Sequence, residues 1–436
     1  MRNFYLLIAI TAILLLGYDA HAQERAVTID ELFELCDNNC SSVKISHIEA
    51  LQAAEGVKAA KSALLPEVET SLSVSFLGDG CIVERDFKSG TNADMPHWGN
   101  NFAIKASQVI YAGGAISAGI KQAKIEKEIA EQNIILTKQN MRFLLLGYYL
   151  ELFKLNNRAM VLEKNIEQAR LLLKHIEKKY EQGVTLKNDI TRYELQLEQL
   201  LLLLNDTKNN TRIINHRITS TLNLPIGTII VPDSALMNNI LPVRSIKEWQ
   251  ECADNNNPQL QMASLGLSLQ KQKEKTAKAA KLPQVALVAA NHFDGPITIE
   301  VPTIDKNFNY WYVGLGVRYN LSSLWKANKK CRIERLGTTR AKESLNLAQE
   351  ENEIAMNNAY IMFEQATQHL KTQEKSVELA TQNYNVVNNR YLNDLALITD
   401  MIDASNAKLN AQLQLVNARI NLIYSYHNLK RTAGTL

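Results

Sequence analysis

Four segments of the chain alternate apolar and polar residues with a period of two. The alternation is clear over 68–76 and 311–321, shorter over 102–107 and weaker over 285–293. This period gives a β-strand one apolar and one polar face. The pattern alone fits a soluble sandwich with a covered core, or a sheet whose apolar face meets lipid. Strands of about ten residues suit a tilted crossing of a bilayer, and aromatic residues gather near one end, which favours a lipid-facing sheet.

The stretches between these strands follow a helical period and predict six helices. Apolar residues recur at seven-residue steps, for example at Ile129, Leu136, Phe143 and Leu150, and form a stripe that faces partner helices. A helix of about 65 residues rises roughly 100 Å, which is longer than a globular core requires. The sequence therefore predicts long helices packed side by side. Their expected bounds are about 30–64, 114–181, 188–222, 246–281, 326–391 and 397–431.

The order of these elements occurs twice in the chain. The Leu-Pro pair at Pro66 returns at Pro283 after 217 positions, and the tryptophan that opens a strand at Trp98 returns at Trp311 after 213. The helix break at 180–183 returns at 391–394 after 211 positions. Such landmarks in one order indicate a tandem duplication. The predicted domains are a first repeat over 23–227, a connector over 228–245 and a second repeat over 246–436.

The first 22 residues have the features of a secretory signal peptide. Arg2 precedes an apolar run over 6–17, and the small-x-small pattern from Ala20 to Ala22 precedes Gln23. A membrane anchor is the alternative, but the apolar run is shorter than the ~20 residues that span a bilayer as a helix. We therefore expect an exported mature chain that begins at Gln23.

Composition excludes several classes of protein. The chain of 436 residues carries 48 Lys and Arg against 45 Asp and Glu, a formal charge of +3, which argues against a nucleic-acid binder. Only nine prolines and 18 glycines interrupt it, which favours long helices. No metalloprotease, serine-hydrolase or nucleotide-binding motif is present, so we expect neither an enzyme nor a cofactor.

Five cysteines, an odd number, occur in this chain. Cys36 and Cys40 are one helical turn apart, which is compatible with a metal or redox pair or with small buried thiols. No nearby histidine or further cysteine completes a ligand set, so we favour buried thiols and expect no metal site.

Four strands are too few to close a barrel in lipid. The smallest membrane barrels have about eight strands, and an open edge in lipid leaves backbone groups unpaired. Three copies of the chain would supply twelve strands. We therefore predict an α+β fold in which long antiparallel helical coiled coils, forming an α-barrel, join a transmembrane β-barrel that is completed by trimerisation, with four strands per chain and an internal tandem repeat.

These landmarks resemble the TolC-type outer-membrane efflux protein family. The resemblance implies a homotrimeric passive exit duct that lies in outer-membrane lipid, extends into the periplasm and docks with an inner-membrane pump through a periplasmic adaptor protein. It implies neither an enzyme nor a nucleic-acid partner. The motifs that carry the resemblance are the runs 108–114, 257–260, 311–315 and 417–422.

The resemblance also implies a gate at the periplasmic entrance. Asp400 and Asp403 occupy the acidic entrance positions, Asp189 matches Asp400 in the first repeat, and Tyr391 matches a constraining tyrosine. Three copies of the first two carboxylates would make a ring that favours cations. Ordinary solvated helix residues at this spacing are the alternative. Ala396 replaces a basic residue of the family, so an ionic latch to Asp189 would need Arg192 or Arg390.

A periplasmic coiled-coil adaptor or scaffold protein is the rival interpretation of the chain. It would explain the export signal and the long helices. It would not explain two strand hairpins with bare apolar faces, which is why we favour the exit duct.

Overall fold

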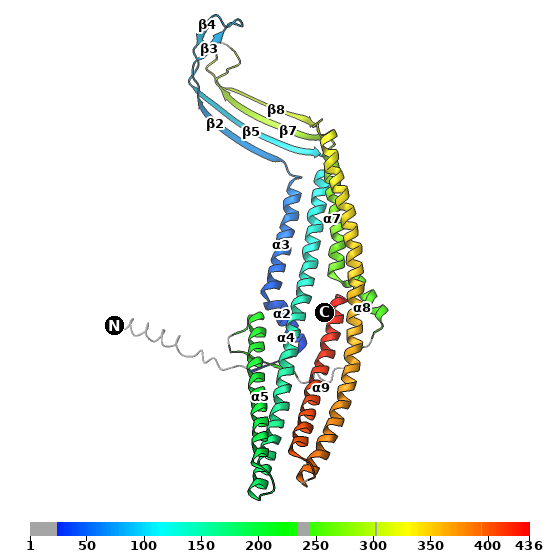
Figure 1. The fold of residues 1–436 in the computed structure, drawn as a ribbon. Helices are drawn as coiled ribbons and strands as arrows, with labels where there is room; N and C mark the ends of the chain where they lie inside the picture. The colour runs from blue at the N-terminus through cyan, green and yellow to red at the C-terminus, as the bar shows by residue number, and fades with distance from the viewer. Residues whose placement is uncertain (1–23, 226, 234–241, 243, 301–302, 394) are drawn as a thin grey trace, which may run out of the picture. The chain divides into compact units, whose positions relative to one another are not determined.

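The computed structural model describes residues 24–225, 227–233, 242, 244–300, 303–393 and 395–436 (Figure 1). The predicted signal peptide over 1–22 and much of the predicted connector over 228–245 therefore lie outside the described residues. None of the described helices has an apolar stretch long enough to cross a membrane.

The four longest helices form two antiparallel hairpins (Figure 1). Helix α4 (Ala115–Glu181) turns into α5 (Lys187–Thr221), and α8 (Ser323–Leu392) turns into α9 (Ile398–Thr432). The predicted bounds of these helices are confirmed to within a few residues. Helices α5 and α9 both contain 35 residues and begin 211 positions apart, so the internal repeat read from the sequence is also present in the fold.

The prediction of the two shorter helices was wrong in one respect, because the structure has two consecutive helices in place of each. The structure has α2 (Ile29–Asn39) and α3 (Ser41–Ser62) in the first repeat, and α6 (Ile246–Asn256) and α7 (Pro258–Ala279) in the second. The breaks fall at Cys40 and Asn257, which both have extended backbones. Proline disfavours the helical conformation of the residue before it, which explains the break at Asn257. Cys40 adopts the same conformation without a following proline.

Two capping boxes fix the starts of α2 and α6. The main-chain amides of Thr28 and Ser245 each donate to a glutamate three residues later, at 2.8 Å to Glu31 and 2.8 Å to Glu248. The two hydroxyls accept from the amides of the same glutamates, at 3.2 and 3.4 Å. Each box satisfies two amides that a helix N-terminus leaves without partners. Their spacing of 217 positions repeats the offset seen in the sequence.

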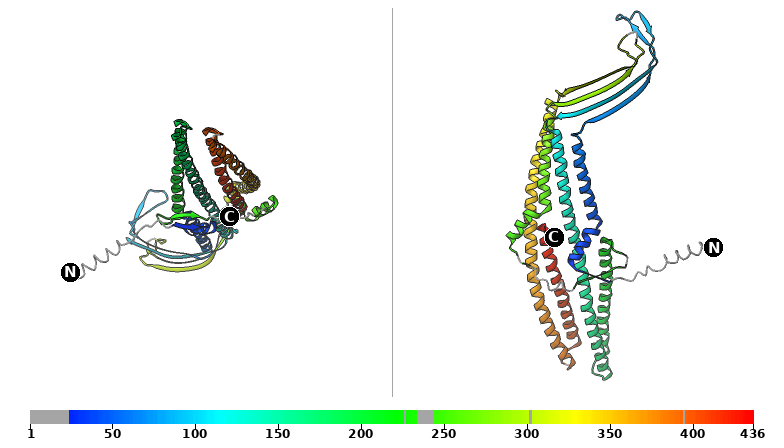
Figure 2. Two further views of the ribbon diagram at one scale, coloured as in Figure 1. Left: turned by 90° about the horizontal axis from the view of Figure 1, so that it is seen from below. Right: turned by 180° about the vertical axis from the view of Figure 1, so that it is seen from behind.

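A four-stranded antiparallel sheet has the order β2-β5-β7-β8 and is curved, as Figure 2 shows. Its strands are β2 (Glu67–Phe76), β5 (Trp98–Tyr111), β7 (Gln284–Gly295) and β8 (Phe308–Arg318). Each repeat supplies one hairpin, and the pairing of β5 with β7 joins the two. The four predicted strands are confirmed, and β2 and β8 leave the two outer edges of the sheet unpaired in a single chain.

The apolar side of the sheet is bare. The register places Val68, Ala106, Ala289 and Val313 in one row, and paired residues of neighbouring strands point to the same face. Val68 is 65% exposed and Val313 is 62% exposed. The alternation read from the sequence therefore gives a sheet whose apolar face has no covering layer within the described chain.

Two further pairs of short strands were not predicted. A hairpin of β3 (Gly80–Val83) and β4 (Gly90–Ala93) lies in the loop between β2 and β5. Strands β1 (Glu24–Val27) and β6 (Ile229–Pro232) pair in parallel. Each strand has four residues, which is too short for a period of two to be distinguished from chance.

The chain forms two compact units that each take segments from both repeats. We call the first the hairpin unit (Met1–Ile48, Gln132–Gln261 and Ala348–Leu436) and the second the sheet unit (Glu49–Glu131 and Met262–Leu347). A core of the hairpin unit packs the middle of α4, including Leu145 and Tyr149, against Val27 and Ile230. The Tyr149 hydroxyl donates to the Val27 carbonyl at 2.7 Å, which fastens β1 to this core.

Candidate functional site at the helical hairpin ends

The turns that close the two helical hairpins share an equivalent main-chain hydrogen bond. The amide of Val184 donates to the Lys179 carbonyl at 2.9 Å, and the amide of Leu395 donates to the Arg390 carbonyl at 2.8 Å. The offset between these pairs is 211 residues. In the first turn Gly183 has a φ of 73°, a conformation that glycine adopts without strain. Both turns belong to the hairpin unit and contain the predicted gate residues.

Asp189 and Asp400 occupy equivalent places in the first turns of α5 and α9. The Asp189 carboxylate accepts from the Leu186 amide at 3.3 Å and from the Thr185 hydroxyl at 2.6 Å. The Asp400 carboxylate accepts from the Leu397 amide at 3.1 Å. A carboxylate at this position satisfies a free amide and interacts favourably with the helix dipole. The two residues thus stabilise the hairpin ends and place one carboxyl group at each turn.

Tyr391 is buried at the end of α8, where a lysine of the other hairpin contacts it. The Lys179 ammonium nitrogen lies 5.1 Å from the centre of the Tyr391 ring and 3.3 Å from its carbonyl oxygen. A cation at this distance from an aromatic ring is attracted by the negative face of the ring. Tyr391 is only 6% exposed, whereas its counterpart Tyr180 is 44% exposed. The two hairpins are therefore joined asymmetrically at their closed ends.

A small core holds the two hairpins together behind these turns. It contains Tyr193, Tyr391, Ile398 and Met401. Burial raises the pKa of Tyr193, so its phenol stays neutral over the pH range in which proteins are stable. Farther along, the Gln196 amide donates to Asn406 Oδ1 at 2.6 Å, which links α5 to α9.

A second lysine and tyrosine lie next to this core. The Lys408 ammonium is 4.2 Å from the centre of the Tyr384 ring and donates to Gln168 Oε1 at 3.4 Å. Burial lowers the pKa of Lys408 because it removes water from the charged ammonium. The contact therefore places a partly desolvated cation between α9, α8 and α4.

The remaining predicted gate residue, Asp403, is exposed on α9. Its counterpart in the first repeat is Arg192, so the duplication does not preserve the sign of charge here. Within the described ranges, no ion pair joins Asp189 to Arg192 or Arg390. Asp394, which belongs to the predicted helix break, lies outside the described residues.

Sequence reasoning missed Lys179 as a partner of Tyr391. The two residues are 212 positions apart, and no local pattern brings them together. The repeat offset offered an indirect signal, because it aligns Lys179 with Arg390 and so marks a basic residue directly before the tyrosine in both repeats.

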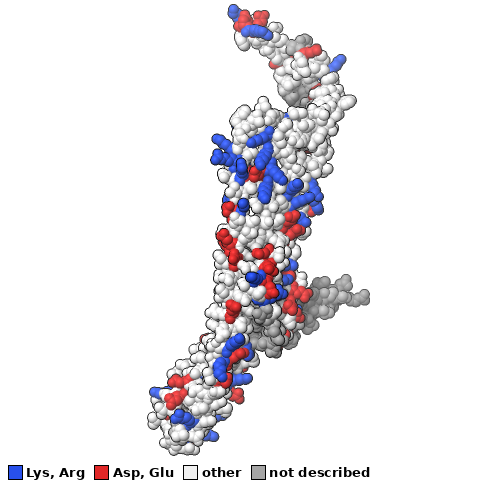
Figure 3. Space-filling view, turned by 90° about the vertical axis from the view of Figure 1, so that its right-hand side faces the viewer, with Lys and Arg blue, Asp and Glu red and all other residues white. Residues whose placement is uncertain are grey.

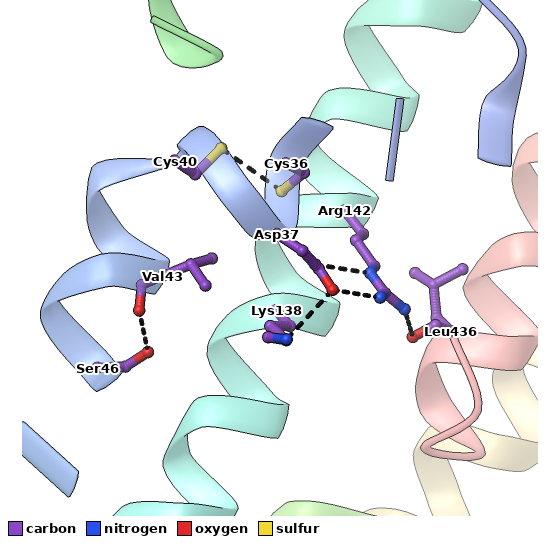
Figure 4. Close-up of polar contacts among 8 residues, drawn as sticks. All are labelled: Cys36, Asp37, Cys40, Val43, Ser46, Lys138, Arg142 and Leu436. Carbon is purple, nitrogen blue, oxygen red and sulfur yellow. Dashed lines mark hydrogen bonds and ion pairs between the residues drawn. The ribbon is translucent and has the colours of Figure 1, made fainter. Parts of the chain in front are cut away.

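Cys36 and Cys40 are buried in the core that surrounds the middle of α4 (Figure 4). Their sulfur atoms are 3.5 Å apart, and the Cys40 thiol lies 3.4 Å from the Thr221 carbonyl oxygen. The hydrogen bond with the Cys40 thiol and then burial raise the pKa of Cys36, so it stays protonated. No group of three or more metal-binding side chains occurs in the part of the chain that the structure describes.

An ion cluster next to these cysteines connects α2 to α4 (Figure 4). Arg142 donates to both oxygens of Asp37, at 3.1 and 2.6 Å, and to the Leu436 main-chain oxygen at 3.1 Å. Lys138 lies 3.2 Å from the same carboxylate. Burial alone would raise the pKa of Asp37, but the contacts with Arg142 and then Lys138 outweigh it and lower the pKa.

Comparison with known proteins relates part of the sequence to a family. Residues 249–435 match the family described as outer membrane efflux protein. No curated protein matches the chain by sequence.

Solved structures share its fold over most of its length. The outer membrane protein VceC from Vibrio cholerae has a TM-score of 0.79 at 15% identity, covering 93% of this chain and 96% of its own. The outer-membrane channel OprN has a TM-score of 0.77 at 15% identity, with coverage of 94% and 90%. The CmeC outer membrane channel from Campylobacter jejuni has a TM-score of 0.75 at 16% identity, with coverage of 93% and 85%. Residues 249–435 are therefore similar to the outer membrane efflux protein family, and the chain shares the α+β fold of these outer-membrane proteins over more than nine-tenths of its length.

Proposed function

We propose that the protein is a trimeric outer-membrane exit duct of a tripartite efflux or secretion system, which passively conducts substrates from the periplasm to the exterior. The bare apolar face of the four-stranded sheet carries this proposal. Leu72 in β2 is 71% exposed, and Trp311 in β8 is 74% exposed. Burying apolar area is worth about 25 cal/mol per Å². A sheet face with such exposed apolar side chains is stable in contact with lipid and unfavourable in water.

The two open edges of the sheet support trimerisation. In lipid, the unpaired groups of β2 and β8 need partners, because no water is present to bind them. If β8 of each copy pairs with β2 of the next copy, both edges gain hydrogen-bond partners and the sheets close into a ring. Three copies supply twelve strands, which is enough for a membrane barrel with an open interior.

A gate formed by Asp189, Asp400, Asp403 and Tyr391 is part of the proposal. All four residues lie at or next to the closed ends of the helical hairpins, where the duct would begin. The carboxylates of Asp189 and Asp400 are held by backbone amides, so their charges have fixed positions. Rings of carboxylates favour cations, and the contact of Tyr391 with Lys179 would restrain the hairpins in the closed state.

Two measurements test the duct. Purified full-length protein should require detergent and run as a trimer, and a soluble monomer would contradict the proposal. In planar bilayers the channel should prefer cations.

The acidic gate has its own test. Asp400→Asn with Asp403→Asn should weaken the cation preference, because it removes two carboxylates per chain and keeps the amide oxygen that accepts from Leu397. Glu350→Gln with Glu353→Gln is the matched control, since these two carboxylates are also exposed and three residues apart on α8. Unchanged selectivity in the first variant would remove these residues from the gate.

The proposed partners are a periplasmic adaptor protein and an inner-membrane pump. The fold shared with outer-membrane channels supports these partners, and the closed ends of the hairpins are the surface we assign to them. Mild cross-linking in the native cells, followed by purification of the complex, should recover both proteins. Recovery of the trimer alone under conditions that preserve a known tripartite complex would contradict this assignment.

A periplasmic adaptor or scaffold is the second candidate, and the long helical hairpins favour it. It predicts recovery in the soluble periplasmic fraction without detergent. The exit duct predicts recovery in the outer-membrane fraction, so fractionation of native cells separates the two functions.

A further inference from the structure

A dense group of basic residues lies on α7, directly after its end and on the N-terminal part of α8, in the sheet unit (Figure 3). We call it the basic belt. All of its members are exposed except Lys281, which is half-buried. The belt consists of Lys271, Lys273, Lys275, Lys278, Lys281, Lys326, Lys329, Lys330, Arg332, Arg335, Arg340 and Lys342.

The acidic residues within the belt do not neutralise it. Glu274 binds Lys278 at 2.8 Å and accepts from the Thr338 hydroxyl at 2.9 Å. Glu334 accepts from the Gln270 amide at 2.7 Å. Of the described residues of the belt, only Lys278 has an ion pair within 4.0 Å. Most of the positive charge therefore faces solvent in the single chain.

The belt is also a local departure from the balanced charge of the chain. Its two spans, 271–281 and 326–342, contain twelve Lys and Arg and two Glu, which leaves 36 Lys and Arg against 43 Asp and Glu elsewhere. The equivalent spans of the first repeat are nearly neutral. Residues 54–64 contain two Lys and one Glu, and 118–134 contain three Lys and three Glu. Duplication alone therefore does not explain the belt.

The belt begins where the sheet ends. Lys281 lies three residues before β7, and Lys326 lies eight residues after β8. From Lys326 to Arg335 the helix rises only about 14 Å. If the sheet spans a bilayer, as the proposed function requires, the first turns of α8 and the last turns of α7 lie at the level of the lipid headgroups.

We propose that the basic belt binds the anionic phospholipid headgroups of the leaflet that borders the helical end of the sheet. Lysine and arginine next to a membrane-spanning segment are attracted by anionic lipid, over a range set by a Debye length of ~8–10 Å. The long side chains reach this layer while their apolar stems lie along the helix. The belt thus fixes the depth of the sheet in the membrane and selects the lipids around it. This inference rests on the proposed membrane location of the sheet.

Spin-labelled lipids test the proposal on the full-length protein in phosphatidylcholine vesicles. At about 0.1 M salt, the protein should immobilise labelled phosphatidylglycerol several-fold more than labelled phosphatidylcholine, and about 1 M salt should remove most of the difference. A variant with Lys326→Gln, Lys329→Gln, Lys330→Gln and Arg332→Gln should lose the preference. These side chains are exposed, so the variant should keep its helical content, which circular dichroism checks.

A matched control neutralises four exposed cations of the hairpin unit, with Lys164→Gln, Arg170→Gln, Lys174→Gln and Lys371→Gln. It should keep the wild-type preference. Equal immobilisation of both lipids by the wild type, or an unchanged lipid preference in the belt variant, would contradict lipid binding by the belt. Neither result would contradict the proposed exit duct. A change in ion selectivity without a change in lipid preference would also contradict lipid binding by the belt, because the belt would then line the duct. Immobilisation of neither lipid would contradict the membrane location as well.

Discussion

The ammonium of Lys179 on α4 lies 5.1 Å from the centre of the Tyr391 ring on α8. One hairpin thereby places a cation next to a buried ring of the other, at the closed ends of the hairpins, where we place the entrance. The contact also includes a hydrogen bond of 3.3 Å from the ammonium to the Tyr391 carbonyl. This contact must therefore break if the hairpins are to separate at their closed ends.

Lys179→Met should loosen this end of the hairpin unit. The loss of a partly buried cation–π contact and one hydrogen bond should cost about 1 kcal/mol and increase the mean conductance of the channel in planar bilayers. Lys178→Met is the control, because Lys178 is the exposed neighbour on the same helix. Lys179→Arg should retain most of the closed state. Equal conductance in all three variants would show that the contact does not restrain the entrance.

The capping carboxylates should act locally and equally in both repeats. Asp189→Ala and Asp400→Ala each remove an acceptor from the first turn of a helix, at a cost of about 1 kcal/mol. Hydrogen exchange of the amides at 186–190 and 397–401 should accelerate roughly fivefold in the respective variant. Asp403→Ala should leave these rates unchanged, since the Asp403 carboxylate has no hydrogen bond among the described residues.

The two faces of β2 should differ sharply in their tolerance of charge. Leu72→Arg places a cation on the bare apolar face and should cost about 2–4 kcal/mol in a bilayer, which would lower the yield of protein in the outer-membrane fraction. Ser71→Arg changes the adjacent residue on the opposite face and should have a small effect. Similar yields of the two variants would contradict a lipid-facing sheet.

Asp37 should make the hairpin unit sensitive to acid. Its pKa is lower in the folded protein than the ordinary value of 3.8, so its stabilising contribution is present above that value and is lost as the pH falls through the folded pKa. Arg142→Met removes both hydrogen bonds to this carboxylate and should cost about 2 kcal/mol at neutral pH, between the values for exposed and buried pairs.

Asp37→Asn provides the control for this pH dependence. It should flatten the loss of stability below pH ~4, because the amide does not titrate. Thermal unfolding followed by circular dichroism between neutral pH and pH ~3 measures both variants. An acid transition of the same steepness in Asp37→Asn would assign the effect to other carboxylates.

The strands and the long helices could be predicted because their signals are local. Alternation from Val68 to Phe76 predicts both a strand and its apolar face. The scarcity of proline allows α4 and α8 to continue without a break over their whole length. The break at Cys40 could not be predicted, because no proline follows it, whereas the proline after Asn257 was a signal that the helix prediction overlooked.

The family resemblance predicted Asp400, Asp403 and Tyr391 of the candidate site, and the duplication added Asp189 as the counterpart of Asp400. The equal lengths of α5 and α9 keep Asp189 and Asp400 in equivalent positions, so the repeat offset identified the pair. The contact of Lys179 with Tyr391 depends on how two distant hairpins pack, and no single segment encodes it. The basic belt was hidden for a different reason, because the net charge of +3 averages it with an acidic remainder.

The pairing of β5 with β7 has a consequence for biogenesis. Tyr111 pairs with Val285, so the central ladder of the sheet joins residues 174 positions apart. Until the second hairpin pairs with it, the first hairpin has an apolar face and an unpaired edge that invite aggregation. A truncated chain that ends before β7 would leave this edge of β5 without a partner strand and could not complete the sheet.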